Sequence, residues 1–205
     1  MALLKVTDQL RIVTAKQLSA RFWSNNMENG DKSLKKLGKK GYLLRHVLKN
    51  KNKTMVIYTL GPAGCKLLNK PYQPNWWARV ELKEILKILV FNQLYLRIHH
   101  SMDSKALQAP YPLTSVIIIN NREFPVLVVR GDIGEIAREV RWADLNRAMV
   151  ICEEHEQIEK IALNINIPAR FTTDYELCFK SLNEAFYSYN READTVEKET
   201  VDIFG

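Results

Sequence analysis

The period of the apolar residues changes at Gly41, and this change constrains the fold of the first seventy residues more than any other feature. Before Gly41 the apolar residues recur at helical spacing, with Thr14 as a candidate N-cap. Asn29-Gly30 is typical of a turn, so a third helix is expected to open at Asp31. After Gly41 two strand-like runs flank a lysine-rich tip. We therefore expect helices over 3–13, 15–23 and 31–41, and then a β-hairpin with strands over 42–48 and 54–60 and its tip at 49–53.

The charge of the chain is unevenly divided. The 205 residues carry a net charge of +7, but residues 1–80 hold 16 Lys and Arg against 3 Asp and Glu, whereas residues 81–205 hold 14 against 20. A basic module of this size most often faces a polyanion, which is a nucleic acid or an anionic membrane surface. With 46% hydrophobic and 26% charged residues, the composition excludes a disordered or collagenous chain.

Two short runs in the basic module resemble parts of winged helix-turn-helix domains. Residues 33–43, Ser-Leu-Lys-Lys-Leu-Gly-Lys-Lys-Gly-Tyr-Leu, look like the end of a recognition helix entering the first wing strand. Residues 58–64, Tyr-Thr-Leu-Gly-Pro-Ala-Gly, resemble the close of the wing hairpin before the next helix. The resemblance covers residues 3–68 and implies a winged-helix DNA-binding domain over 1–70.

The cations of this module predict a contact with double-stranded DNA. A helix fits the major groove and reaches base edges with its N-terminal side chains, while flanking lysines contact phosphates. RNA is disfavoured because no aromatic stacking platform accompanies the cations. Two alternatives stay open: the lysines form an ordinary solvated helix face, or the winged helix serves as the scaffold of a protein-interaction adaptor. The candidate DNA-binding residues are Asn25, Asn26, Asp31, Lys32, Ser33, Lys35, Lys36, Lys39 and Lys40 around the third helix, and Lys49, Lys51 and Lys53 at the wing.

The rest of the chain predicts a separate α/β domain over 78–189, joined through a proline-containing linker at 71–77. A central mixed sheet is expected because β-branched runs alternate with amphipathic segments, so the whole fold is of the α+β class. Trp76-Trp77 are expected to cover the start of this core. The polar tail 190–205 is expected to be frayed or disordered. The expected elements are a helix over 78–100, strands over 116–119 and 126–129, a helix over 131–142, a strand over 147–152, a helix over 153–164, a strand over 169–172 and a helix over 175–189.

The order of these elements resembles a restriction-endonuclease-like core. With the winged helix in front, the chain is similar to the replication-relaxation family of plasmid and other mobile-element proteins. An active nuclease of that fold would need an acid on one strand and an acid-x-lysine on the next, to hold Mg²⁺ and orient water. Because the strands carry no acid-x-lysine, we expect a catalytically silent domain with no metal and no cofactor. The alternative is a diverged metal-dependent nuclease that uses Asp132 or Glu123 with Glu81 or Glu84, and Mg²⁺-dependent cleavage of plasmid DNA would favour it.

The expected location is the cytoplasm, at the nucleoid or a plasmid. The sequence shows no signal peptide and no apolar run near the ~20 residues of a membrane span. Its three cysteines, Cys65, Cys152 and Cys178, form no disulfide framework. The expected function is a non-enzymatic transcriptional regulator, or a replication or transfer accessory factor, of a plasmid, phage or other mobile element, with the C-terminal domain contacting a protein partner.

A homodimer is also expected, because pairing lengthens the DNA site that such regulators read and because the long apolar helix offers a surface for it. Light scattering at micromolar concentrations is expected to give about twice the mass of one chain, which is 23.8 kDa. A mass of one chain throughout that range would contradict the dimer.

Overall fold

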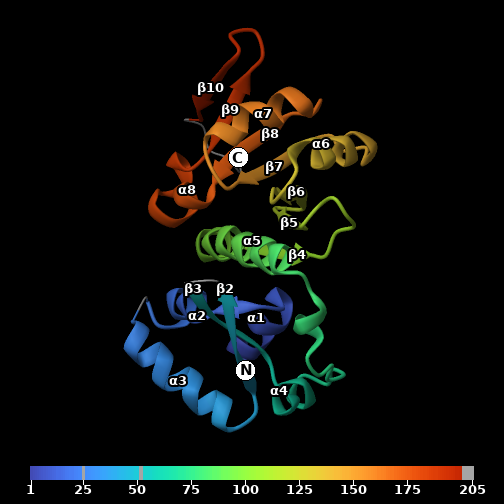
Figure 1. The fold of residues 1–205 in the computed structure, drawn as a ribbon. Coiled ribbons are helices and arrows are strands. Elements are labelled where there is room, and N and C mark those ends of the chain that lie inside the picture. Colours follow the sequence, from blue (N-terminus) through green and yellow to red (C-terminus); the bar gives the residue numbers. More distant parts are fainter. Residues whose placement is uncertain (25, 51–52, 200–205) are drawn as a thin grey trace. The chain divides into compact units, whose positions relative to one another are not determined.

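The computed structural model describes residues 1–24, 26–50 and 53–199 (Figure 1). The chain divides into two compact units, Met1–Asn92 and Gln93–Gly205. The division falls inside one continuous helix, α5 (Leu82–Ser101). The N-terminal unit carries 18 Lys and Arg against 5 Asp and Glu, and the C-terminal unit carries 12 against 18. The charge asymmetry of the sequence is therefore an asymmetry between the two units.

The N-terminal unit has the element order of a winged helix. Three helices, with a short strand after the first, precede the hairpin, and the three strands form one antiparallel sheet in the order β1-β3-β2. The three predicted helices and the hairpin are present, and the α+β class of the whole chain is confirmed. The first helix ends at Leu10, and Val13, which was expected inside it, lies in β1 because it pairs with Tyr58 of β3. The elements of this unit before α5 are α1 (Ala2–Leu10), β1 (Val13–Thr14), α2 (Ala15–Phe22), α3 (Met27–Lys39), β2 (Leu43–Asn50), β3 (Lys53–Leu60), α4 (Pro62–Leu67) and a 3-10 turn, η1 (Trp76–Arg79).

The start of α3 differs from the prediction. The helix begins at Met27, and the side chain of Asn26 caps it by accepting a hydrogen bond from the Asn29 N–H at 3.0 Å. Gly30 is buried inside the helix, where a Cβ atom would come within 2.1 Å of the Ser19 hydroxyl on α2. This glycine permits two helices to cross closely, so the expectation of a turn at Asn29-Gly30 and of a helix opening at Asp31 was wrong.

The two faces of the small sheet have different partners. Ile57 and Tyr58 are neighbours on β3, so their side chains lie on opposite faces. Ile57 belongs to a buried cluster with Ile12 and with two residues of α5. Trp76 and Trp77 pack against this cluster of the N-terminal unit, and not on the core of the C-terminal domain, where they were expected. The cluster contains Ile12, Ile57, Ile85 and Leu89, with Trp76, Trp77 and Val80 among the residues packed against it.

Two buried amides fix the first half of α5 to the N-terminal unit. The Gln17 side chain on α2 donates to the Leu89 carbonyl at 2.7 Å. The Asn92 side chain donates to the carbonyls of Leu10 and Ile12 at 3.1 and 2.6 Å. Because buried carbonyls without a donor are costly, these bonds specify where the helix lies as well as stabilising it.

The C-terminal unit is built on a seven-stranded sheet in the order β10-β9-β8-β7-β6-β5-β4. β6, β7 and β8 are parallel and the other pairs are antiparallel, which confirms the predicted mixed sheet. None of the helices in the described ranges is long and apolar enough to span a bilayer. Beyond α5, the elements are β4 (Ser104–Leu107), β5 (Ser115–Ile119), β6 (Arg122–Val128), α6 (Ile133–Trp142), β7 (Ala148–Cys152), α7 (Glu156–Asn164), β8 (Ala169–Thr173), α8 (Asp174–Phe179), η2 (Leu182–Glu184), β9 (Tyr187–Asn190) and β10 (Thr195–Lys198).

The end of the chain departs furthest from the prediction. The expected helix over 175–189 ends at Phe179, and β9 and β10 form a hairpin where a disordered tail was expected from residue 190. Phe186 is fully buried, and Tyr187 and Tyr189 pack against the core of the unit. The aromatic residues of this segment therefore continue the sheet instead of lining a helix. Residues 200–205 lie outside the described ranges.

Candidate nucleic-acid interface

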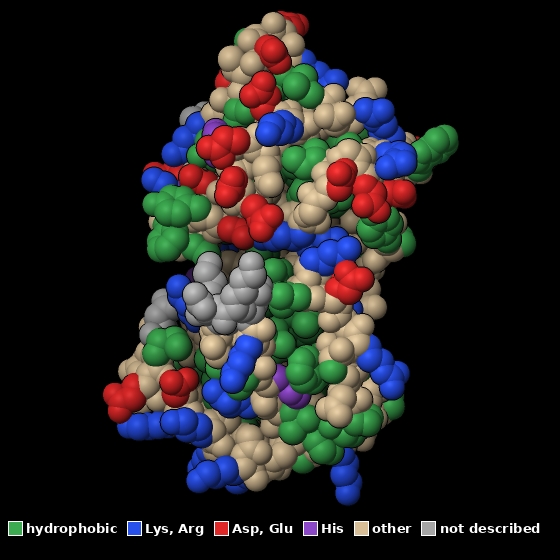
Figure 2. Space-filling model, viewed as in Figure 1, with side chains coloured by type: hydrophobic (Ala, Val, Ile, Leu, Met, Phe, Trp, Pro, Cys, Tyr) green, Lys and Arg blue, Asp and Glu red, His purple; other side chains and the backbone are tan. Residues whose placement is uncertain are grey.

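The α3 helix presents its lysines to solvent, as its period predicts. Leu34 is fully buried and Leu37 is half-buried, so the opposite side of the helix faces outward. Figure 2 shows Lys and Arg side chains along the outer side of α3, with acidic side chains at one end. Ser33 is half-buried, whereas the other predicted residues of the helix and its C-cap are exposed: Asp31, Lys32, Lys35, Lys36, Lys39 and Lys40.

The acidic residues of α3 are confined to its first half. Glu28 accepts a hydrogen bond from Lys32 at 2.7 Å, and both side chains are more than two-thirds exposed. An exposed pair of this kind contributes little to stability, but it neutralises Lys32. Among the described residues, no carboxylate lies within 4.0 Å of the ammonium groups of the four later lysines, Lys35, Lys36, Lys39 and Lys40. The positive charge of the helix is therefore concentrated in its second half.

Arg45 on β2 lies on the same side of the small sheet as α3. Arg45 is paired across the hairpin with Tyr58, so the two side chains lie on the same face of the sheet. Burial raises the pKa of Tyr58, Arg45 opposes that rise, and the nearby carboxylate of Asp31 adds to it. Since one tyrosine interacts with Asp31 of α3 and with Arg45 of the wing, the helix and this face of the wing are close together.

Lys49 extends this face of the wing. It follows Arg45 by four residues on the same strand, so its side chain points to the same side of the hairpin, and it is exposed. Arg45 was missing from the predicted set, although its place in an alternating strand next to the lysine-rich tip was a usable signal. We use the name basic face for Lys35, Lys36, Lys39, Lys40, Arg45 and Lys49.

The remaining predicted contacts are placed differently. Asn26 is exposed, but its side-chain oxygen is used as the N-cap of α3. Lys53 is the first residue of β3. Asn25 and Lys51 lie outside the described residues. Because α3 begins four residues earlier than predicted, Asn29 becomes an exposed residue of its first turn and joins the candidates for base contact.

The acids of the alternative nuclease site are dispersed. Glu123 lies near the beginning of β6, whereas Asp132 follows the end of that strand and caps α6 by accepting from the Glu135 N–H at 2.8 Å. Glu81 and Glu84 lie 3.1 and 2.8 Å from the ammonium groups of lysines on α5. Within residues 1–24, 26–50 and 53–199, no three His, Cys, Asp or Glu side chains form a group that could hold a metal ion.

A charged cluster closes the carboxyl ends of the three parallel strands. Arg130, after β6, donates to both carboxylate oxygens of Asp174 at 2.6 Å and lies 3.8 Å from Glu153, after β7. The Arg130 side chain is only 5% exposed, and it also donates to the Val129 carbonyl. Burial raises the pKa of Asp174, and Glu153 adds to that rise, while Arg130 opposes it. This arrangement joins three strand ends, and the Arg130 guanidinium is bonded to groups of the protein itself.

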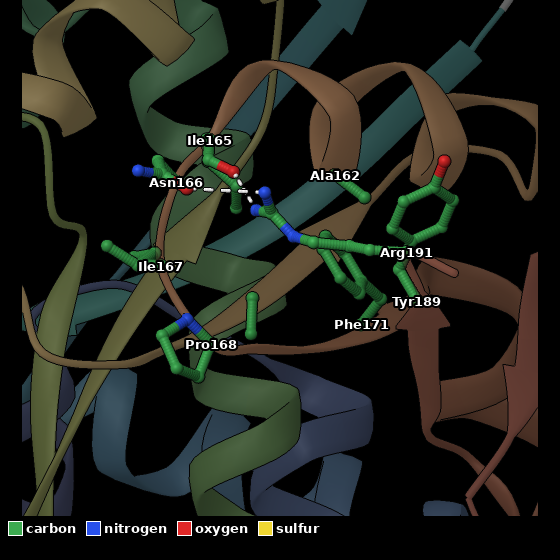
Figure 3. Close-up of a pocket in the computed structure, with 9 residues that line it drawn as sticks. Ala162, Ile165, Asn166, Ile167, Pro168, Phe171, Tyr189 and Arg191 are labelled. Carbon is green, nitrogen blue, oxygen red and sulfur yellow. Dashed lines mark hydrogen bonds between the residues drawn. The ribbon is translucent and has the colours of Figure 1, made fainter. Parts of the chain in front are cut away.

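A cavity of about 290 Å³ lies between the loop after α7 and the β9–β10 hairpin (Figure 3). The Arg191 side chain crosses it, and its guanidinium donates to the Ile165 carbonyl at 2.7 Å and to the Asn166 side chain at 3.2 Å. Arg191 thus ties the hairpin to the loop. The arrangement explains why the chain remains ordered after Tyr189.

Comparison of the chain with protein-family models, with curated proteins and with solved structures found no match. The similarity to the replication-relaxation family and the restriction-endonuclease-like character of the C-terminal unit therefore stay predictions.

Proposed function

We propose that the protein binds double-stranded DNA through the basic face and is a non-enzymatic transcriptional regulator, or a replication or transfer accessory factor, of a mobile element. The observation that carries the proposal is a set of six exposed cations on α3, on its C-cap and on one face of β2, within a winged-helix element order. Phosphate contacts of such cations supply affinity and position the helix, while α3 itself has the shape that enters the major groove.

The charge distribution supports DNA over the alternative of an ordinary solvated helix face. Solvated helices commonly carry both signs interspersed, which keeps the local field low. Here the acids of α3 lie in its first half, and the second half and the neighbouring wing strand carry only cations among their charged residues up to Lys49. A surface of this kind attracts a polyanion over a distance comparable to the Debye length, which is about 8 Å at physiological salt.

Binding to a fluorescently labelled duplex is expected to weaken steeply as the salt concentration rises. Each cation that contacts a phosphate contributes roughly 0.9 to the slope of log affinity against log salt, because its contact releases a counterion. The double variant Lys35→Ala/Lys36→Ala is therefore expected to lower the slope by about 2 and to weaken binding to all sequences alike. Arg45→Ala is expected to lower the slope by about 1, because it removes one cation of the basic face. Fluorescence anisotropy between 50 and 200 mM salt measures both quantities.

The matched control is Lys160→Ala, which removes an exposed lysine from α7 in the acidic unit and is expected to leave the slope unchanged. Affinity that is constant across the salt range, or equal losses in the control and in the basic-face variants, would contradict the proposal. The second of these results would favour general electrostatic attraction over a defined interface.

A further inference from the structure

Three arginines line a cavity of about 350 Å³ on the sheet of the C-terminal unit. Arg122 is the first residue of β6, Arg147 immediately precedes β7, and Arg170 is the second residue of β8. The three strands are adjacent and parallel, so their amino ends lie at the same edge of the sheet. Residues that are 25 and 23 positions apart in the sequence are thereby brought to one site.

The register of the strands places these side chains on one face of the sheet. Val126, Met149 and Arg170 are direct neighbours across β6, β7 and β8, so their side chains point the same way. Arg122 precedes Val126 by four residues, and Arg147 precedes Met149 by two, so both belong to that face. The opposite face is closed by the buried cluster that packs against α6 and α7.

The floor of the cavity is apolar and partly aromatic. Phe124 precedes Val126 by two residues and lies under the Arg147 guanidinium, which is 4.9 Å from the centre of its ring. Arg147 also donates to the Glu123 carbonyl at 3.2 Å, so its guanidinium is held at the cavity wall. Met149, Pro125 and Pro168 are among the other apolar residues of the lining. Cations around a flat apolar floor suit a ligand that combines a negative charge with a ring.

A carboxylate of the chain itself already occupies one side of the cavity. Glu199 accepts a hydrogen bond from the Nε of Arg170 at 2.8 Å, and its backbone N–H donates to the Phe186 carbonyl at 2.9 Å. Its second carboxylate oxygen is buried and has no hydrogen-bond donor among the described residues. The Glu199 carboxylate shows that the site accommodates an anionic group, and it leaves Arg122 and Arg147 on the other wall.

We propose that this cavity binds a small organic anion, one in which a phosphate or carboxylate is attached to a flat ring. The arginines would hold the anionic group, and Phe124 with Met149 would contact the ring. Ligand pockets in proteins commonly measure about 300–1,000 Å³, so the volume here suits a small molecule. A polyanion is disfavoured because the unit that surrounds the cavity carries 12 Lys and Arg against 18 Asp and Glu. The proposal does not depend on the DNA-binding function proposed above.

The test is isothermal titration calorimetry of the full chain. The four titrants are adenosine monophosphate, benzoate, inorganic phosphate and uncharged adenosine. One of the two ring-bearing anions is expected to bind more tightly than inorganic phosphate and than adenosine. Which of them binds identifies the anionic group as phosphate or carboxylate. Arg122→Ala and Arg147→Ala, which replace exposed side chains, are each expected to weaken that binding about tenfold or more, the usual effect of losing a charge-assisted hydrogen bond.

Two further variants make the test specific. Arg138→Ala removes an exposed arginine from α6 and is expected to bind as the wild type does. Glu199→Gln removes the competing carboxylate and is expected to strengthen binding. The proposal is overturned if neither ring-bearing anion binds at millimolar concentration, or if Arg122→Ala and Arg147→Ala bind as tightly as Arg138→Ala. Inorganic phosphate binding as tightly as adenosine monophosphate would overturn the role given to the apolar floor.

Discussion

Replacing Gly64 with alanine is expected to destabilise the N-terminal unit by about 1–3 kcal/mol, the usual cost of forcing an atom into a filled site. Gly64 is buried in α4, and a Cβ atom there would lie 2.3 Å from the Tyr42 carbonyl oxygen and 3.2 Å from the Leu60 side chain. The Tyr42 oxygen belongs to backbone and cannot rotate away. It also accepts a hydrogen bond from the Gly61 N–H at 2.9 Å, which a displacement would weaken. Urea denaturation followed by circular dichroism measures the loss.

Gly38→Ala is the matched control for this prediction. Gly38 lies in α3, and the nearest atom to a Cβ at this position is the Leu43 carbonyl oxygen at 4.0 Å, so the methyl group fits without displacement. Alanine is better than glycine inside a helix by up to about 1 kcal/mol, and the control is therefore expected to leave the N-terminal unit as stable or more stable. Equal stabilities of the two variants would contradict the packing that we describe between α4 and Tyr42.

Asp174→Leu is expected to destabilise the C-terminal unit by about 3 kcal/mol, the lower end of the range for breaking a buried ion pair, because Asp174 keeps 39% of its side chain exposed. Among the described residues, this change leaves Glu153, at 3.8 Å, as the remaining ion-pair partner of the buried Arg130 guanidinium. Thermal unfolding of the full chain, compared with wild type at the same pH, measures the effect.

The double variant Arg130→Met/Asp174→Leu is expected to recover most of that stability. Burial raises the pKa of Asp174, Arg130 opposes that rise, and the nearby Glu153 carboxylate adds to it, so the carboxylate lies in a site that disfavours its charge. Two apolar side chains of similar size remove both charges together, a change that is often neutral or stabilising. If the double variant were less stable than Asp174→Leu alone, the pair would be a net source of stability and this interpretation would be wrong.

The helices and the hairpin of the N-terminal unit could be predicted from the sequence because the patterns that indicate them are local. Helical spacing around Leu34 and alternation after Gly41 are each fixed by neighbours within a few residues, and the structure confirms both. The start of α3 was missed because Gly30 has a turn-like composition but a tertiary role, the close contact with Ser19 on another helix. The β9–β10 hairpin was missed for the same reason, since Phe186 is placed by the core and not by its own segment.

The residues of the candidate sites also fall into two groups, those that a local sequence pattern indicates and those that only the tertiary structure brings together. The lysines of α3 were found because a run of cations on one helix is visible in sequence, and their exposure agrees with the prediction. Arg45 required the register of the hairpin, which puts it opposite Tyr58. Arg122, Arg147 and Arg170 were out of reach of any local pattern, because only the parallel pairing of three strands brings them together.

The continuity of α5 determines where the protein can be cut. A fragment that ends in the proline-containing linker would lose Ile85 and Leu89, and with them the cover over Ile57. It would also leave the Gln17 amide and the carbonyls of Leu10 and Ile12 without their partners on α5. The N-terminal unit is therefore longer than the boundary at residue 70 that the sequence predicts, and it includes the first half of α5.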